Sequence, residues 1–411
     1  MPAESVSPSP VAPPAVFTPW GWPLPYRSVA GSAIAWLQGH GWWPIGLGYQ
    51  PLWSGQNAVM LTLQSRRLLE QRGLQAMILP FASGVALEQA FVAGQLQVAS
   101  LGTVSAALLL DRGAPVQSVL IQTPNLKVGI VVPRSSPLAR IGDLRGSGQR
   151  IGVQLDSRAY AYLLASAAAN GLSINRDFFP VGMDLESQQT LPSNVAGVAT
   201  WEPILSFLTD NSNTGRLIDR IYPYLFVGDH LIVRRELIEA VPEVVQALVD
   251  AYEEAVLIIR LDPTETVQVL TRQPHLDVYS QPFLRQQTVA YTTLYKPTFT
   301  YPFLDFWSTG CAQVAALLVQ NGLISRPIDQ AAWMGFLEPR FVASTFNHLG
   351  WAIPSRPPWL PASWTGTVGQ PPYPPYLTVD TLRQPQPWPE PADLTRPWSF
   401  GGTIYFPASG A

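Results

Sequence analysis

An arginine, a tryptophan and a glutamate in the middle of the chain have the chemistry to bind a small polar molecule. Arg158 lies in the first turn of a predicted helix, where the helix N-terminus carries a partial positive charge. A guanidinium is unfavourable there unless an anion accepts hydrogen bonds from it and from the backbone N–H groups. Trp201 offers a flat apolar wall, and Glu202 accepts hydrogen bonds from an amine or within a hinge. Together they predict recognition of an anion or a zwitterion.

Each of these residues also has a purely structural alternative. Arg158 can pair with Asp156 on the surface, and Trp201 can be a core residue. Small residues at other predicted helix starts are either ligand contacts or simple caps and turn residues. They are Ser83, Gly102, Thr103 and Ser157.

The chain shows no pattern typical of a catalytic or metal site. The four histidines are scattered without ligand spacing, so zinc is not expected. A Gly-x-Ser-x-Gly elbow, a phosphate loop and a dinucleotide glycine pattern are all absent. Cys311, the single cysteine, lies in an apolar helical pattern typical of a packed core thiol. We therefore predict no catalytic residue, no cofactor and no metal.

The elements that position the candidate residues alternate between strand and helix. Between residues 45 and 113 the predicted strands are Ile45–Tyr49, Ala76–Pro80 and Gln97–Leu101, and the predicted helices are Ala58–Arg72, Gly84–Ala93 and Thr103–Arg112. Small polar turns precede two of the helices, and a parallel sheet gathers such turns at its carboxyl edge. The helix N-termini then face a common space that suits an anionic or polar molecule.

A second strand–helix series begins near Thr123 and includes the predicted helix Ser157–Asn170 and the strand Val195–Trp201. Another strand, Leu225–Arg234, is followed only by helices, which usually pack back on an earlier layer. The pattern predicts an α/β fold in which a second domain interrupts the first. We expect an N-terminal extension over 1–43, a first lobe over 44–122 and 228–343, a second lobe over 123–227, and a Pro/Trp-rich tail over 344–411.

Composition excludes several classes of protein. The 411 residues carry a net charge of −3 without a basic cluster, which argues against nucleic-acid binding. Residues 28–64 lack Asp, Glu, Lys and Arg, but other polar residues and prolines interrupt them, so a membrane-spanning helix is not expected. The first residues show no basic n-region and no continuous apolar run, so a secretory signal is not visible.

Six segments in a fixed order resemble the aliphatic-sulfonate, taurine and nitrate group of solute-binding proteins of ABC importers, which also includes binders of thiamine pyrimidine precursors. The resemblance covers residues 45–343. The segments are Ile45–Gln50, Ser83–Gly102, Ser136–Gly146, Gly152–Leu164, Ala199–Pro203 and Val319–Asp329.

The resemblance implies the two-lobed, type II periplasmic-binding-protein fold, each lobe a mostly parallel sheet flanked by helices. It also implies a hinged cleft that captures a small polar solute, as a monomer with ABC permease subunits as partners. Membrane contact then occurs only through the permease, in a periplasmic or other extracytoplasmic location. The expected ligand-binding residues are Gln50, Trp53, Ser54, Ser83, Gly102 and Thr103 in the first lobe and Ser157, Arg158, Tyr160, Trp201 and Glu202 in the second.

Because the chain departs from the family pattern, the resemblance does not identify the solute. Where many members have Gly-Ser-Ser-Ala-His, this chain has Asp156-Ser-Arg-Ala-Tyr160, so ligand identity does not carry over. One alternative is a cytoplasmic enzyme on the same fold, of the thiamine-pyrimidine or menaquinone pathway type. The chain lacks the cysteine cluster of the pyrimidine synthases. Another alternative is an interaction protein that acts through its Pro/Trp-rich tails.

Overall fold

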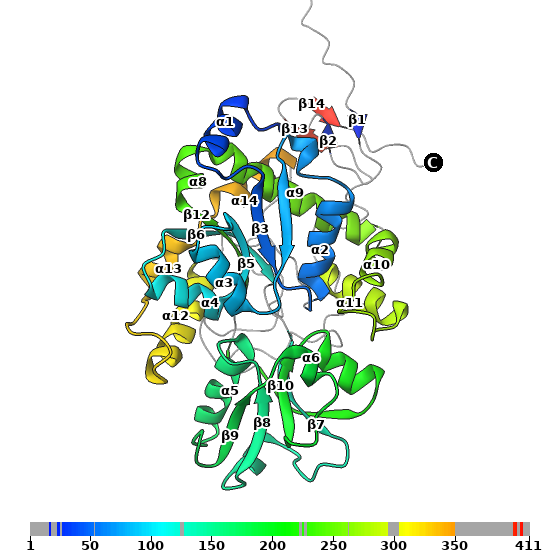
Figure 1. Ribbon diagram of the computed structural model, residues 1–411, viewed down its shortest axis with the longest axis vertical. Helices are drawn as coiled ribbons and strands as arrows, with labels where there is room; N and C mark the ends of the chain where they lie inside the picture. The colour runs from blue at the N-terminus through cyan, green and yellow to red at the C-terminus, as the bar shows by residue number, and fades with distance from the viewer. Residues whose placement is uncertain are drawn as a thin grey trace, which may run out of the picture.

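Two five-stranded sheets form the centres of two lobes, one above the other in Figure 1. The computed structural model describes residues 16–17, 23–24, 27–52, 54–123, 127–221, 224–225, 228–261, 263–294, 304–349, 398–400 and 403–405. The first sheet has the order β4-β3-β5-β12-β6, with β3 Ile45–Tyr49, β4 Ala76–Pro80, β5 Val98–Gly102, β6 Val116–Thr123 and β12 Asp229–Arg234. The second has the order β11-β7-β10-β8-β9, with β7 Val128–Pro133, β8 Gln149–Val153, β9 Phe178–Gly182, β10 Gly197–Trp201 and β11 Gly215–Arg220.

Helices cover both sheets. The helices of the first lobe are α1 Gly31–Gly39, α2 Ser54–Ser65, the 3-10 turn η1 Glu70–Arg72, α3 Gly84–Val92, α4 Thr103–Asp111, α8 Arg235–Ala240, α9 Pro242–Leu261, α10 Thr264–Leu270, α11 Gln281–Leu294, α12 Leu304–Gln320, α13 Gln330–Phe336 and α14 Arg340–Leu349. Those of the second are the 3-10 turn η2 Ile141–Leu144, α5 Arg158–Ala169, α6 Leu185–Gln188, α7 Ile204–Ser206 and the π-helical turn η3 Phe207–Asn211.

The helices of the first lobe form two groups. Helices α2, α9, α10 and α11 pack together, and α12 packs on α4 and α13. Figure 1 shows α2, α10 and α11 on one side of the first sheet and α3, α4, α12 and α13 on the other. The interior strands β3 and β10 are buried along their whole length, as expected where helices cover both faces of a sheet. The apolar core therefore lies between each sheet and its two helical layers.

Both sheets are mixed, which corrects the expected mostly parallel arrangement by one strand in each lobe. Strand β12 is antiparallel to β5 and β6, and β7 is antiparallel to β10 and β11. The register gives the reason, because Asp229 at the start of β12 pairs with Gly102 and Thr123 at the ends of β5 and β6. Each of these strands follows a crossing from the other lobe. It enters its sheet at the edge where the other strands end, and so it must run the opposite way.

The chain crosses between the sheets twice, between β6 and β7 and between β11 and β12. The first crossing lies between Thr123 and Val128, and the second lies between Arg220 and Asp229. Strands β6 and β11 were not among the predicted elements. The helix expected over 58–72 is shorter, because α2 ends at Ser65 and Arg67 adopts a left-handed conformation with a φ of 54°.

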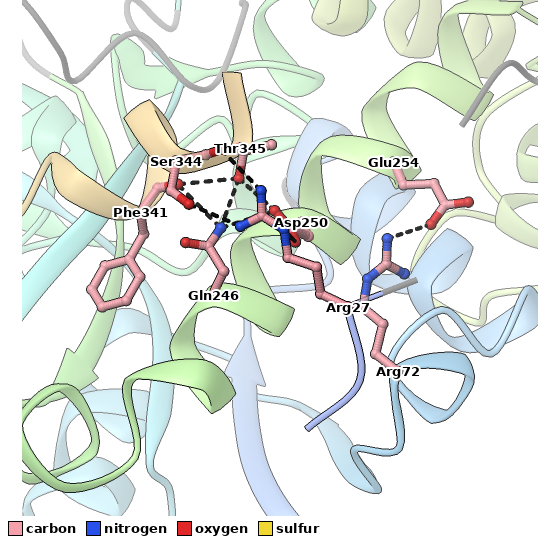
Figure 2. A network of polar contacts seen from close by, with 8 residues as sticks. All are labelled: Arg27, Arg72, Gln246, Asp250, Glu254, Phe341, Ser344 and Thr345. Atoms are coloured by element: carbon pink, nitrogen blue, oxygen red, sulfur yellow. Dashed lines mark hydrogen bonds and ion pairs between the residues drawn. The ribbon is translucent and has the colours of Figure 1, made fainter. Parts of the chain in front are cut away.

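A buried carboxylate joins the segment before α1 to the last helix of the first lobe (Figure 2). Asp250 on α9 is 2% exposed and accepts hydrogen bonds from Gln246 at 2.9 Å and Thr345 at 2.6 Å. The Arg27 Nε lies 3.9 Å from Asp250 Oδ2, and its Nη1 donates to Ser344 Oγ at 2.8 Å. Residue 27 and α14 are thus held on the same part of α9.

The predicted domain boundaries stay predictions. The boundary at residue 43 falls between α1 and β3, and that at 343 falls inside α14. Two short hairpins, β1 Val16–Phe17 with β2 Pro23–Leu24 and β13 Trp398–Phe400 with β14 Thr403–Tyr405, belong to the terminal segments. Strand β13 lies against α14. Among the described residues, no helix has both the length and the apolar character needed to cross a membrane.

Candidate ligand-binding cleft

A cleft with about 500 Å³ of empty space, open solvent included, lies between the two lobes. Both sheets point the ends of their parallel strands toward it, so the turns that follow those strands form its walls. The first lobe contributes Gln50, Gln56, Gly84, Ser100, Gly102, Val104, Ser105 and Asp229. The second lobe contributes Gln154, Asp156, Ser157, Arg158 and Trp201.

Three helix N-termini converge on this cleft, those of α3, α4 and α5. Ser83 caps α3 by accepting from Ala86 N at 3.2 Å, and Ser157 caps α5 by accepting from Tyr160 N at 3.3 Å. Helix α4 starts after Gly102 without a side-chain cap. A Cβ at Gly102 would lie 3.1 Å from Asp229 Oδ1, so glycine allows this carboxylate to approach the start of α4. The three N-termini together favour a negative group in the cleft.

Arg158 forms an ion pair with Asp229 across the two lobes. The side chains are 8% and 4% exposed, so the pair is shielded from solvent. The partner is neither the bound anion nor the surface pairing with Asp156 that the sequence left as alternatives. Asp156 lines the cleft separately, with a φ of 57°. Asp229 lies in a different predicted segment, so only the fold reveals the pairing.

A chain of polar groups supports the floor of the cleft in the first lobe. The Gln56 side chain accepts a hydrogen bond from Gln50 N at 2.6 Å and donates to the Ser100 hydroxyl, which in turn donates to Gln122. Gln56 is 1% exposed and Ser100 is fully buried. Sequence reasoning missed both residues. The signal that was present is a lone serine inside the otherwise apolar strand β5, where a buried hydroxyl needs a partner.

Trp201 lines the cleft, whereas Glu202 turns away from it. Trp201 is 6% exposed at the end of β10. Glu202 accepts hydrogen bonds from Ser206 N at 3.0 Å and Ser206 Oγ at 2.6 Å, and Lys127 Nζ lies 3.6 Å away. Burial raises the pKa of Glu202, and Lys127 partly offsets this effect. Lys127 belongs to the first crossing between the lobes, so Glu202 contacts this crossing, and its hinge role stays a prediction.

Thr103 lies beneath the cleft at the start of α4. It is 1% exposed, and its hydroxyl donates to Gly228 O at 2.6 Å and lies 3.2 Å from His230 Nε2. The other ring nitrogen of His230 lies 3.0 Å from Ser118 Oγ. Burial lowers the pKa of His230 to about 3, so the ring is neutral at physiological pH. This buried group ties α4 to the start of β12, next to Asp229.

The cleft brings together five of the predicted residues. Those that line it are Gln50, Gly102, Ser157, Arg158 and Trp201. Ser83, Thr103, Tyr160 and Glu202 are not among its described lining residues. Trp53 lies outside the described residues, and Ser54 is known only as the first residue of α2. The lining residues absent from the prediction are Gln56, Gly84, Ser100, Val104, Ser105, Gln154, Asp156 and Asp229.

No cluster of three or more metal-ligating side chains occurs in the described part of the chain. The charged residues known to line the cleft are one guanidinium and two carboxylates. The arrangement therefore combines a positive region, formed by Arg158 and the helix N-termini, with acidic hydrogen-bond acceptors on both lobes. These features suit non-covalent binding of a small polar molecule.

Two lobes joined by two crossings, with a cleft at the ends of their strands, define the architecture of a two-lobed solute-binding protein. Residues 58–266 match the NMT1/THI5-like family, and because this match spans half of the chain, the protein belongs to that family. No curated protein matches the sequence.

Solved structures of binding proteins share the fold. The alkanesulfonate-binding protein SsuA from Xanthomonas axonopodis pv. citri, bound to MOPS, is 22% identical with a TM-score of 0.60 over 72% of this chain and 97% of that one. The periplasmic aliphatic sulphonate binding protein SsuA from Escherichia coli is 18% identical with a TM-score of 0.58, over 70% and 90%. The periplasmic nitrate-binding protein NrtA from Synechocystis PCC 6803 is 13% identical with a TM-score of 0.58, over 74% and 88%. At these identities the likeness establishes the fold alone.

Proposed function

We propose that this protein is the solute-binding component of an ABC importer and captures a small polar solute with an anionic group between its lobes. The observation that carries the proposal is the cleft itself, which Arg158 and three helix N-termini from both lobes surround. A negative group there receives backbone N–H donors from two separate bodies at once. Sulfonates, nitrate, taurine and related molecules have the required charge and size.

Ligand binding drives closure only if the ligand contacts both lobes. A ligand with equal affinity for the open and closed forms leaves the equilibrium between them unchanged. Gln50, Gly84 and Ser105 lie on the first lobe, and Ser157, Arg158 and Trp201 on the second. A solute that bridges these groups favours the closed form.

The two lobes also meet through aromatic side chains. The ring centroid of Phe207 in the second lobe lies 5.0 Å from that of Tyr279 and 6.0 Å from that of Phe283, both in the first lobe. This aromatic contact is a second place, besides the Arg158–Asp229 ion pair, where side chains of the two lobes meet.

An importer requires a permease that binds the closed form of the solute-binding protein. The solute-binding protein must then be located outside the cytoplasm. Both belong to the proposal. They are supported by the shared fold with binding proteins that are described as periplasmic in Escherichia coli and Synechocystis.

The test is to identify the solute that the protein carries. The protein is purified from its own host without denaturation, and native mass spectrometry then measures the mass of any bound small molecule. We expect one small anion or zwitterion, which is released when the protein is unfolded. When this solute is added back to the refolded protein, X-ray scattering should show a smaller radius of gyration, because the lobes close. A metabolite that the protein converts to a product in the same assay would instead indicate an enzyme.

A further inference from the structure

The ion pair between Arg158 and Asp229 occupies the position where an anionic solute would bind. Arg158 is the first residue of α5 in the second lobe, and Asp229 is the first residue of β12 in the first lobe. Both side chains line the cleft and both are more than nine-tenths buried. A solute anion that reaches the Arg158 guanidinium therefore competes with the carboxylate of Asp229.

Two buried acceptor atoms beside this pair lack donors. One oxygen of Asp229, Oδ1, contacts Arg158, while Oδ2 is buried and accepts no hydrogen bond from any residue that the structure describes. The side-chain oxygen of Gln154 is in the same situation, again among described residues, and it too lines the cleft. A buried acceptor without a donor is costly, because the group has given up its hydrogen bonds to water. These two atoms therefore call for a ligand with hydrogen-bond donors.

We infer that Asp229 is an internal counter-anion that makes the cleft selective for a dipolar solute, one with an anionic group and a cationic N–H donor. The inference rests on the proposed function and narrows its solute class. A plain anion that takes Arg158 leaves Asp229 as a buried charge without its cation, which is strongly unfavourable. A dipolar solute presents its anion to Arg158 and the helix N-termini and its amine to Asp229.

The charge of Asp156 also favours a dipolar solute. Asp156 is a second carboxylate on its wall, so the described lining has two carboxylates and one guanidinium. The negative side chains attract a cation, while the backbone N–H groups of α3, α4 and α5 attract an anion. Both preferences are met by a single molecule with separated charges.

The test compares taurine with ethanesulfonate, which share the sulfonate and differ by the amine. Calorimetry measures both affinities for the wild-type protein and for Asp229→Asn, with Asp277→Asn at an exposed position as the matched control. We expect the wild type and the control to prefer taurine by about tenfold or more, the worth of one charged hydrogen bond. In Asp229→Asn we expect taurine to bind about tenfold more weakly and ethanesulfonate about tenfold more tightly.

A second variant, Arg158→Gln with Asp229→Asn, removes both charges and is expected to lose the discrimination between the two sulfonates. Circular dichroism confirms that each variant is folded. Equal taurine-to-ethanesulfonate ratios in the wild type and Asp229→Asn, or no gain of ethanesulfonate binding in that variant, overturn the inference. If the wild type still carries a host solute in that case, the proposed function stands. A gain of ethanesulfonate binding by Asp229→Asn in a protein that carries no host solute supports the inference and counts against the proposed function.

Discussion

Arg158 and Asp229 stabilise each other in a place that solvent hardly reaches. Arg158→Ala removes a charged donor, so we expect solute binding to weaken by about 1.5–3 kcal/mol. It also leaves the Asp229 carboxylate buried without its cation, so the free energy of unfolding should fall by about 3–5 kcal/mol. Calorimetry with the co-purified solute and urea denaturation measure the two effects.

The double variant Arg158→Ala with Asp229→Ala separates these effects. Because no buried charge is left over, we expect most of the stability to return while solute affinity stays low. A double variant as unstable as Arg158→Ala would show that the ion pair is not the source of the loss. Arg140→Ala, at a side chain that is 81% exposed, is the control.

His230 gives the folding stability a defined pH dependence. Its pKa is lowered to about 3 in the folded protein, chiefly by burial, against an ordinary value of 6.5. Between about pH 6.5 and pH 3 the His230 ring is therefore protonated in the unfolded chain but neutral in the folded one. The free energy of unfolding falls as the pH is lowered through this range. We expect this residue to account for about 3–5 kcal/mol over that range. Urea denaturation at pH 7 and pH 5 should show a smaller difference in His230→Gln than in the wild type.

Strand β10 positions Trp201 at the cleft and tolerates no side chain at its start. A Cβ at Gly197 would lie 2.6 Å from the backbone oxygen of Val131 on the neighbouring strand β7. We expect Gly197→Ala to lower the free energy of unfolding by about 1–3 kcal/mol, because the two strands must move apart. Gly39→Ala, where nothing lies within 4 Å of the added Cβ, serves as the control. Equal chemical-denaturation midpoints for the two variants would contradict this view of the sheet.

In the whole molecule, the polar network around Asp250 (Figure 2) links α9 and α14, which lie in the part of the first lobe away from the second lobe (Figure 1). Arg27→Ala removes the hydrogen bonds from residue 27 to Ser344 but leaves Gln246 and Thr345 on Asp250. We expect a loss of about 0.5–1.5 kcal/mol in the free energy of unfolding with unchanged solute affinity. Denaturation and calorimetry on the same preparation test this. A large change in affinity would show that the network is coupled to the cleft.

Local sequence signals were sufficient for most elements and for most helix starts, although α2 begins at Ser54 and not at the expected Ala58. Ser83 and Ser157 are the N-caps that their positions predicted, and Gly102 precedes α4 as expected. These features depend on hydrogen bonds within a few residues, so neighbouring residues in the chain determine them. Ser100 and Gln56 escaped prediction because their partners come from other segments.

The sequence by itself determined the two-lobed α/β class and its family, since alternating apolar strands and capped helices recur in a recognisable order. It also placed Arg158 at a helix start that faces a cleft. Only the tertiary structure decided the directions of β7 and β12, the approach of Lys127 to Glu202, and the pairing of Arg158 with Asp229. Each of these depends on which residues the two crossings bring side by side, and the short-range periodicity of apolar residues carries no information about contacts between distant segments.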